Sequence, residues 1–407
     1  EESGINTIAT EVEENADGTI ASLTLNQTAP AEHPVLRPHR LAVGFYDEDP
    51  ATGKIVRTDR FELDVDGKST VVAAAAGKKR PAFILVNDDD LTYTKLRFDA
   101  DSLSFALANL QHFDDALARA VVWLSLWDMT RDGDLAAEKF IDTTLALLAT
   151  ETESTTFRYA LSCMSTTAWH YTAPDRRADV VKHVAKELWK LVIAAPGGSD
   201  QQFQLVTAYL GYGEEGDAEF AEHAQGLFDG SLIVAGLEID NNFTWTIINA
   251  LSSVKLIDQA GIDAQLAKRD TTENREFALG AHAVRGDAAA KEWAWNEALN
   301  NADLTNMQLE AVARGFGATP RPDLAEPYAA KYYDVVDWVW KNKSFHMAEA
   351  LLEGLYPYYA DPATLVELGH RWLADHEDAD NALKRIVRGN VESSQRTLKV
   401  RDFNAAL

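Results

Sequence analysis

The first part of the chain alternates hydrophobic and polar side chains, as half-buried strands do. The runs are short, and turn residues such as Asp66 and Gly67 separate them. The runs expected to be strands are 19–25, 40–46, 55–63, 70–75 and 82–86. Because a sheet with one apolar face needs a partner to cover it, the pattern predicts a small antiparallel β-sandwich domain over residues 1–99.

From about residue 102 the hydrophobic period becomes that of a helix, and it stays helical to the end of the chain. Leu103 and Leu107 fall on one face of the first helix. Asp287, Asp303 and Asp361 precede later periodic runs, as N-cap residues do. Helices joined by short polar turns are typical of helix pairs stacked side by side. We therefore expect residues 100–407 to form an all-α superhelical domain of the HEAT or armadillo kind.

Charge and composition narrow the classes of partner. The 407 residues carry 38 Lys+Arg against 64 Asp+Glu, a formal net charge of −26. Phosphates would repel so acidic a chain, so no nucleic-acid partner is expected. Uncharged stretches fall short of the ~18 apolar residues of a membrane span, and Glu1 to Gly4 show no signal-peptide pattern. Cys163 is the only cysteine, which excludes an intramolecular disulfide and favours a cytoplasmic location.

The sequence lacks the motifs of common enzyme classes. A zinc peptidase helix places two histidines four residues apart beside a glutamate, and no pair here has that spacing. His370 and His376, with Glu377, are six residues apart and would lie on opposite helix faces. No Walker loop, Gly-x-Gly-x-x-Gly or Gly-x-Ser-x-Gly motif occurs. We therefore expect neither catalytic residues nor metal ligands in this chain.

Two polar features remain. The acidic run Asp88–Asp90 follows a strand, and three adjacent carboxylates cannot all point at one cation, so we interpret the run as a solvated turn begun by Asn87. Arg285 and Arg314 lie near the ends of two successive helices. There an arginine caps helix carbonyls, its ordinary role, or binds a ligand carboxylate.

Three motif blocks resemble zinc aminopeptidase N of the actinobacterial branch, within the gluzincin aminopeptidase family. The first is Leu-Val-Asn-Asp-Asp-Asp-Leu-Thr-Tyr at 85–93, and the second is Trp-Asp-Met-Thr-Arg-Asp-Gly at 127–133. The third is spread over 291–357 and includes Lys-Glu-Trp-Ala-Trp, Ala-Arg-Gly-Phe-Gly and Leu-Tyr-Pro. The resemblance covers essentially the whole chain and implies the family's small β-sandwich followed by its C-terminal helical superhelix.

The resemblance also implies a function. The parent protein would be a zinc aminopeptidase that removes N-terminal residues from peptides. Its catalytic domain, which holds the zinc, would precede this region and would be its partner in the same polypeptide. This chain would then need no cofactor and would be inactive alone. In the family the helical domain closes over the active site and shapes the peptide chamber, and basic residues on its inner face meet the C-terminal end of the peptide substrate. By motif position, Arg285 and Arg314 are the substrate-binding candidates here.

Two other hypotheses stay open at this point. The helix-pair pattern alone also fits a stand-alone α-solenoid scaffold that binds another protein. A β-sandwich followed by helices is also found in carbohydrate-active enzymes, in which two carboxylates act as general acid and base. No two acidic residues can be nominated from this sequence as such a pair.

Overall fold

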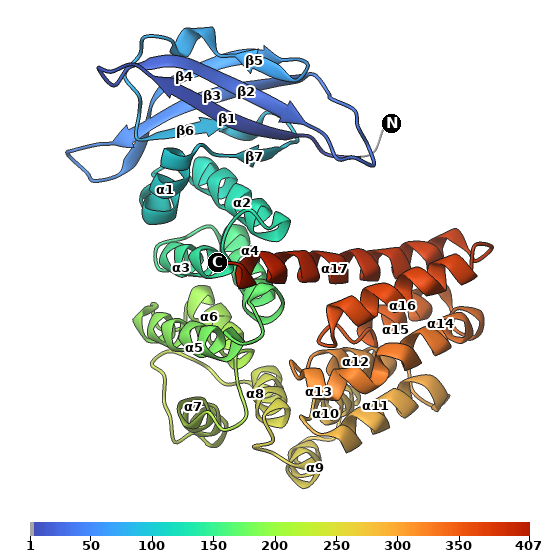
Figure 1. Ribbon diagram of the computed structural model, residues 1–407. Helices are drawn as coiled ribbons and strands as arrows, with labels where there is room; N and C mark the ends of the chain where they lie inside the picture. Colours follow the sequence, from blue (N-terminus) through green and yellow to red (C-terminus); the bar gives the residue numbers. More distant parts are fainter. Residues whose placement is uncertain (1–3) are drawn as a thin grey trace. The chain divides into compact units, whose positions relative to one another are not determined.

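The computed structural model describes residues 4–407, with strands first and helices after them (Figure 1). This order confirms the expected fold class. Residues 1–3, part of the predicted sandwich and of the segment searched for a signal peptide, lie outside the described residues. The chain divides into a first compact unit ending at Thr167, to which Leu407 also belongs, and a second unit, Ala168–Ala406. Strands give way to helices at Ala100, whereas the compact units divide after Thr167. The division into domains 1–99 and 100–407 stays a prediction.

The strands of the first unit form two sheets. One has the order β5 (Ser69–Val71), β2 (Ile20–Thr28), β1 (Thr7–Glu14), β7 (Lys95–Arg97), and the other has the order β4 (Ile55–Val65), β3 (His39–Glu48), β6 (Phe83–Val86). One strand pair departs from the predicted antiparallel arrangement. Strands β1 and β7 run parallel, with Ile8 opposite Leu96, because the chain crosses from one sheet to the other after β6.

The structure does not show the fully solvated turn that the sequence predicts at Asp88–Asp90. Asp88 is only 1% exposed. Its carboxylate accepts hydrogen bonds from the Tyr46 hydroxyl at 2.5 Å and from Nη1 of Arg57 at 2.7 Å. Asn87 does begin a turn, with a left-handed φ of 60°. Asp88 is therefore the buried acidic partner in an ion pair with the partly exposed Arg57 of β4.

The motif at 127–133 ends a helix that is tied to the sheet. The helices of the first unit are α1 (Ala100–Asn109), α2 (Ala116–Asp132), α3 (Ala137–Leu148) and α4 (Ser154–Thr166). The α2 helix ends at Gly133, whose φ of 76° suits glycine. Asp132 in its last turn pairs with Lys95 at 2.7 Å and with Arg97 at 2.6 Å, both on β7. These ion pairs hold α2 against the edge of the four-stranded sheet.

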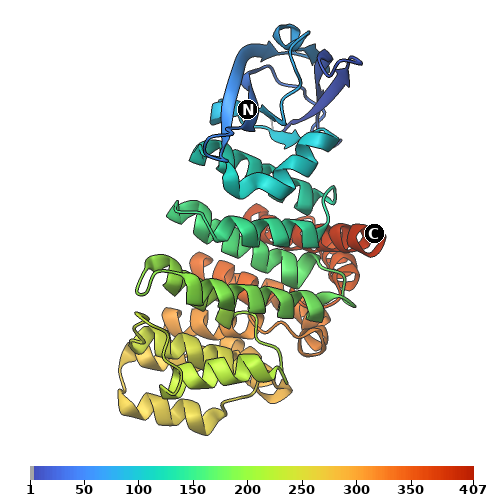
Figure 2. The same cartoon turned by 90° about the vertical axis from the view of Figure 1, so that its left-hand side faces the viewer.

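Helices of the second unit lie in two layers. They are α5 (Arg177–Ala194), α6 (Asp200–Leu210), α7 (Ala218–Asp229), α8 (Asn241–Ser253), α9 (Gln259–Lys268), α10 (Thr272–Ala283), α11 (Ala288–Asn300), α12 (Asn306–Gly317), α13 (Pro322–Ala325), α14 (Ala329–Asn342), α15 (Phe345–Gly354), α16 (Pro362–Asp375) and α17 (Asn381–Ala405). Helices α8, α10, α12, α15 and α17 are neighbours in one layer, and α9, α11, α14 and α16 cover them (Figures 1 and 2). This stacking is the expected superhelical arrangement.

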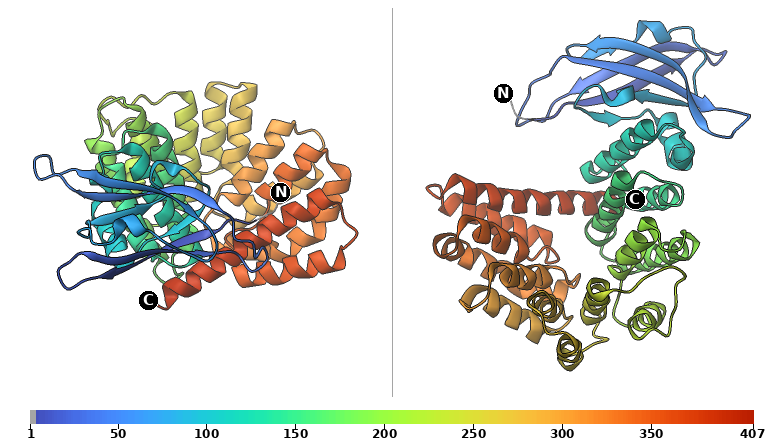
Figure 3. Two further views of the ribbon diagram at one scale, coloured as in Figure 1. Left: turned by 90° about the horizontal axis from the view of Figure 1, so that it is seen from above. Right: turned by 180° about the vertical axis from the view of Figure 1, so that it is seen from behind.

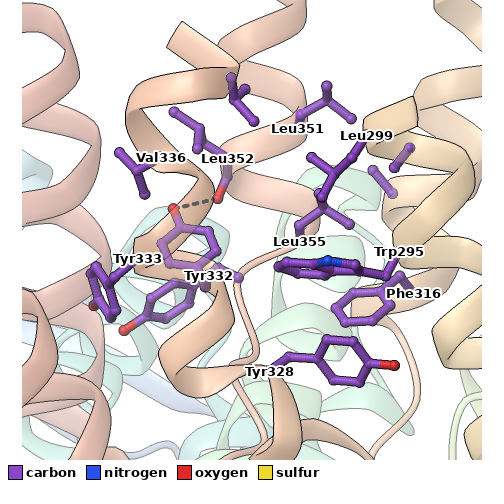
Figure 4. Close-up of a cluster of buried hydrophobic side chains, with 14 of the residues drawn as sticks. Trp295, Leu299, Phe316, Tyr328, Tyr332, Tyr333, Val336, Leu351, Leu352 and Leu355 are labelled. Carbon is purple, nitrogen blue, oxygen red and sulfur yellow. Dashed lines mark hydrogen bonds between the residues drawn. The ribbon is translucent and has the colours of Figure 1, made fainter. Parts of the chain in front are cut away.

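Aromatic side chains fill the core between these layers (Figure 4). Trp295 packs against Phe316 and Tyr328, with ring centroids 5.6 and 5.0 Å away. Tyr332 is completely buried, and its hydroxyl donates to the backbone oxygen of Leu352 at 2.8 Å. The dense aromatic segments of the late chain thus pack helix against helix. Among residues 4–407 no helix combines the length and the apolar character that a bilayer crossing requires.

Most of the expected helix starts are close to the observed ones. Asp287 caps α11 by accepting from the Ala290 amide at 2.9 Å, and Asp361 caps α16. The start predicted at Asp303 is wrong. Helix α12 is capped by Thr305, because its hydroxyl accepts from the Gln308 amide while the Gln308 side chain accepts from the Thr305 amide.

Candidate functional site

Helices α10, α12 and α15 approach closely because glycines lie at their contacts. A Cβ on Gly315 would lie 2.6 Å from the backbone oxygen of Gly280, and a Cβ on Gly317 would lie 2.6 Å from that of Gly354. Real Cβ atoms do not come so near to backbone, so each of these positions needs a residue without one. The close backbones bring the longer side chains of the three helices around shared hollows.

The first hollow is a cavity of about 500 Å³ over α8, α10 and α12. Phe277, Val284 and Met307 give it apolar walls, and Glu273 and Glu276 give it acidic groups. Met307 is 52% exposed, so this side chain meets solvent. Such a hollow suits a ligand with apolar groups.

A second cavity of about 430 Å³ lies over α12 and α15. Glu310, Glu353 and Tyr358 line it. Arg314 and Ala318 line both cavities, so the two hollows adjoin at Arg314. We call the two cavities together the α12 groove.

Arg314 is the one basic side chain among the described residues that line the α12 groove. It is exposed, and its Nε donates to the backbone oxygen of Glu310 at 3.4 Å. The other charged groups of the groove are carboxylates, so a ligand carboxylate would find its one cationic partner at Arg314.

Arg285, the other candidate, is placed differently. It lies between α10 and α11, and its Nη2 is 3.0 Å from Oδ2 of Asp287, the N-cap of α11. It does not line either cavity of the α12 groove. The structure therefore places Arg285 in a helix-junction ion pair and does not bring it together with Arg314.

A third cavity, of about 590 Å³, was not foreseen from the sequence. Trp169, Glu214 and Arg321 are among its lining residues. Arg321 pairs with Glu215 at 2.8 Å and with Asp323 at 2.8 Å. Lys255 together with Arg321 lowers the pKa of Glu215, and Arg321 lowers the pKa of Asp323. Trp169, Glu214 and Arg321 are distant in sequence and belong to no motif, so no sequence signal could have predicted that they line one cavity.

The histidines of the late chain are engaged separately. Nε2 of His376 is 2.9 Å from the Asp337 carboxylate, and its ring stacks on Trp372. Nε2 of His370 is 2.8 Å from Nε2 of Gln395. Over residues 4–407 no three histidine, cysteine or acidic side chains are grouped so as to hold a metal ion. The described residues thus do not fit a zinc site.

Comparison with known proteins decides the family. A family model described as the ERAP1-like C-terminal domain matches residues 83–396. The chain belongs to this family. It is also 34% identical over 412 residues to Aminopeptidase N of Streptomyces lividans, a match that covers 100% of this chain and 48% of that protein. The chain thus spans about half the length of the curated relative it matches. The expected resemblance to the C-terminal region of an actinobacterial aminopeptidase N is confirmed.

Proposed function

We propose that this chain is the non-catalytic C-terminal portion of a zinc aminopeptidase that removes N-terminal residues from peptides. The observation that carries the proposal is the match over the whole chain to about half of Aminopeptidase N. In this proposal the zinc and the reacting groups belong to the partner catalytic domain of the same polypeptide. The helical layers would close over the active site and form a wall of the peptide chamber.

The α12 groove is the part of that wall that would meet the peptide. Its apolar side chains would accept peptide side chains, and Arg314 would bind the C-terminal carboxylate through charge-assisted hydrogen bonds. Because the surrounding groups are Glu276, Glu310 and Glu353, a misplaced carboxylate would be repelled. Arg285 takes a supporting role at most, since its guanidinium already pairs with Asp287.

The test reconstitutes the enzyme by co-expressing this chain with the upstream segment of its parent gene. Release of an aminoacyl chromophore in the presence of zinc should require both pieces. Activity of this chain alone would contradict a non-catalytic role. Absence of activity with both pieces, each folded, would favour the stand-alone scaffold instead.

The role of Arg314 is tested in the reconstituted enzyme with Arg314→Gln. Cleavage of a longer peptide with a free C-terminus should fall by about tenfold in kcat/KM, as expected for the loss of one charge-assisted contact. Cleavage of the small aminoacyl chromophore, and of the same peptide with an amidated C-terminus, should change little. Arg388→Gln, an exposed arginine on α17, is the matched control. Equal losses on all substrates would refute carboxylate binding by Arg314.

A further inference from the structure

Two arginines from the two ends of the second unit's helical series lie in one neighbourhood. Arg177 is the first residue of α5, and Arg401 lies in the last turns of α17. Nε of Arg401 donates to the backbone oxygen of His170 at 2.7 Å, and Asn404 donates to that of Tyr171 at 3.4 Å. The end of α17 thus returns to the beginning of this unit (Figure 3).

Both guanidiniums keep a buried donor that no protein group uses. Arg401 is 9% exposed, and its Nη2 has no acceptor among the described residues. The Nε of Arg177 is likewise buried without an acceptor in residues 4–407. Buried donors are paired in most native proteins, because an unpaired one loses its bond to water and gains nothing in return.

The charges at this place are also poorly compensated. Burial, helped by the charge of Arg177, lowers the pKa of Arg401 to about 10. Burial and the two guanidiniums lower the pKa of His170 to about 3, so this ring is neutral. Tyr359 stacks on it with ring centroids 4.7 Å apart, and burial raises its pKa to about 12. Neither ring supplies the negative charge that two neighbouring guanidiniums need.

The charges of two carboxyl groups act on these arginines, Glu214 on Arg177 and Asp361 on Arg401, but neither carboxyl forms an ion pair with them. Asp361 caps α16, accepting from the amide and the hydroxyl of Thr364 at 2.8 and 2.7 Å. Burial raises the pKa of Glu214, which disfavours its charged form. No carboxylate of residues 4–407 forms an ion pair with Arg177 or Arg401.

We propose that a small oxyanion binds between Arg177 and Arg401, accepts their unused N–H groups, and thereby fastens α5 to α17. A phosphate or a carboxylate group has the oxygen acceptors that guanidinium donors match. Such a site acts locally although the chain carries a net charge of −26, because distant exposed charges are screened by salt. This site is separate from the α12 groove and does not depend on the proposed aminopeptidase role.

Binding is measured by titrating inorganic phosphate into the 407-residue chain at constant ionic strength, with calorimetry and phosphorus NMR as readouts. A second arm uses a small N-acetylated dipeptide with a free carboxylate, and the same dipeptide as its amide. We expect saturable one-to-one binding of phosphate, or of the dipeptide acid but not of its amide. Comparison of the two arms shows which oxyanion the site prefers. Absence of saturable binding in both arms would overturn the proposal.

Variants locate the site. Arg177→Gln should weaken binding by at least about tenfold, because charge-assisted bonds are lost. Arg401→Gln should do the same, and Arg388→Gln on the exposed face of α17 should bind as the parent chain does. The Nε of Arg177 has no acceptor among the described residues, so Arg177→Gln should keep the fold even if loss of the Arg401 bond to His170 loosens α17 in the other variant. Unchanged binding in folded Arg177→Gln would refute the assignment.

The fastening role has its own readout, which is amide hydrogen exchange in the last turns of α17. Saturating phosphate or dipeptide acid, whichever binds, should slow exchange of residues 400–404 in the parent chain. The same addition should leave exchange unchanged in Arg177→Gln. Binding without any slowing in the parent chain would overturn the claim that the anion joins the two helices.

Discussion

The ammonium of Lys291, on α11, donates to the backbone oxygen of Ala283, the last residue of α10, at 2.7 Å. The same group donates at 3.2 Å to the backbone oxygens of Gly315 and Phe316, in the last turn of α12. Lys291 is 2% exposed and caps the carbonyl ends of two helices at once. Helix C-termini carry partial negative charge and unpaired carbonyls, which favour a donor side chain there. One buried side chain thus joins two of the helices that shape the α12 groove.

Replacing Lys291 should therefore loosen this part of the molecule. Lys291→Met fills similar space but leaves buried carbonyl oxygens without a donor, so we expect a loss of about 1–3 kcal/mol in the free energy of unfolding. Urea denaturation followed by circular dichroism measures it. Lys341→Met, at an exposed position of α14, should change stability by less than about 0.5 kcal/mol. Equal effects of the two substitutions would contradict the capping role.

The same lysine makes stability depend on pH. Burial lowers the pKa of Lys291 to about 7, although Asp287 partly opposes the change. In the unfolded chain a lysine has a pKa of about 10.4. Between these values the unfolded chain binds one more proton than the folded chain, so this residue's contribution to stability rises with pH. The difference in unfolding free energy between the parent chain and Lys291→Met should therefore grow from about pH 7 to about pH 10. A flat or falling difference would show that the buried amine stays charged.

The glycine contacts predict a second effect on stability. In Gly315→Ala the new methyl group would lie 2.6 Å from the Gly280 oxygen and 2.7 Å from Cβ of Ala283, so α10 and α12 must separate. We expect a loss of about 1–3 kcal/mol, as for other overpacked contacts. Gly389→Ala is the matched control, because a Cβ there meets nothing within 4 Å on α17. That control should be neutral or stabilising by up to about 1 kcal/mol, since alanine favours a helix.

The buried ion pair of the first unit can be tested in the same way. Asp88→Asn keeps the shape but removes the charge opposite Arg57, while the Tyr46 hydroxyl retains an acceptor. We expect a loss of about 2 kcal/mol, less than for a fully buried pair, because the Arg57 side chain is 35% exposed. Asp90→Asn, in the same turn but exposed, should cost less than about 0.5 kcal/mol. A solvated turn would instead tolerate both substitutions equally.

The fold class could be predicted from the hydrophobic period, because every strand and helix buries one face and shows this in its own sequence. Pairing between distant segments was harder to predict. Strand β1 pairs in parallel with β7, and Asp88 pairs with Arg57, although these segments are far apart in sequence. The local pattern of one segment contains no information about which distant segment it will contact. Arg314 could be named by motif position, whereas its cavities arise from close glycine packing that no motif describes. The same motif argument also named Arg285, which pairs with Asp287.

The single cysteine offers a direct probe of the first unit. Cys163 on α4 is 3% exposed, and burial raises the pKa of its thiol to about 12. The thiolate is the reactive form, so at about pH 8 the native chain should resist a chromogenic disulfide reagent. In denaturing guanidinium the same residue should react stoichiometrically and at the rate of free glutathione. Labelling under native conditions should then require local or global opening of the first unit. Asp88→Asn should increase the labelling rate of Cys163 if opening of the sandwich also exposes α4. Fast native labelling of the parent chain would contradict the burial of Cys163.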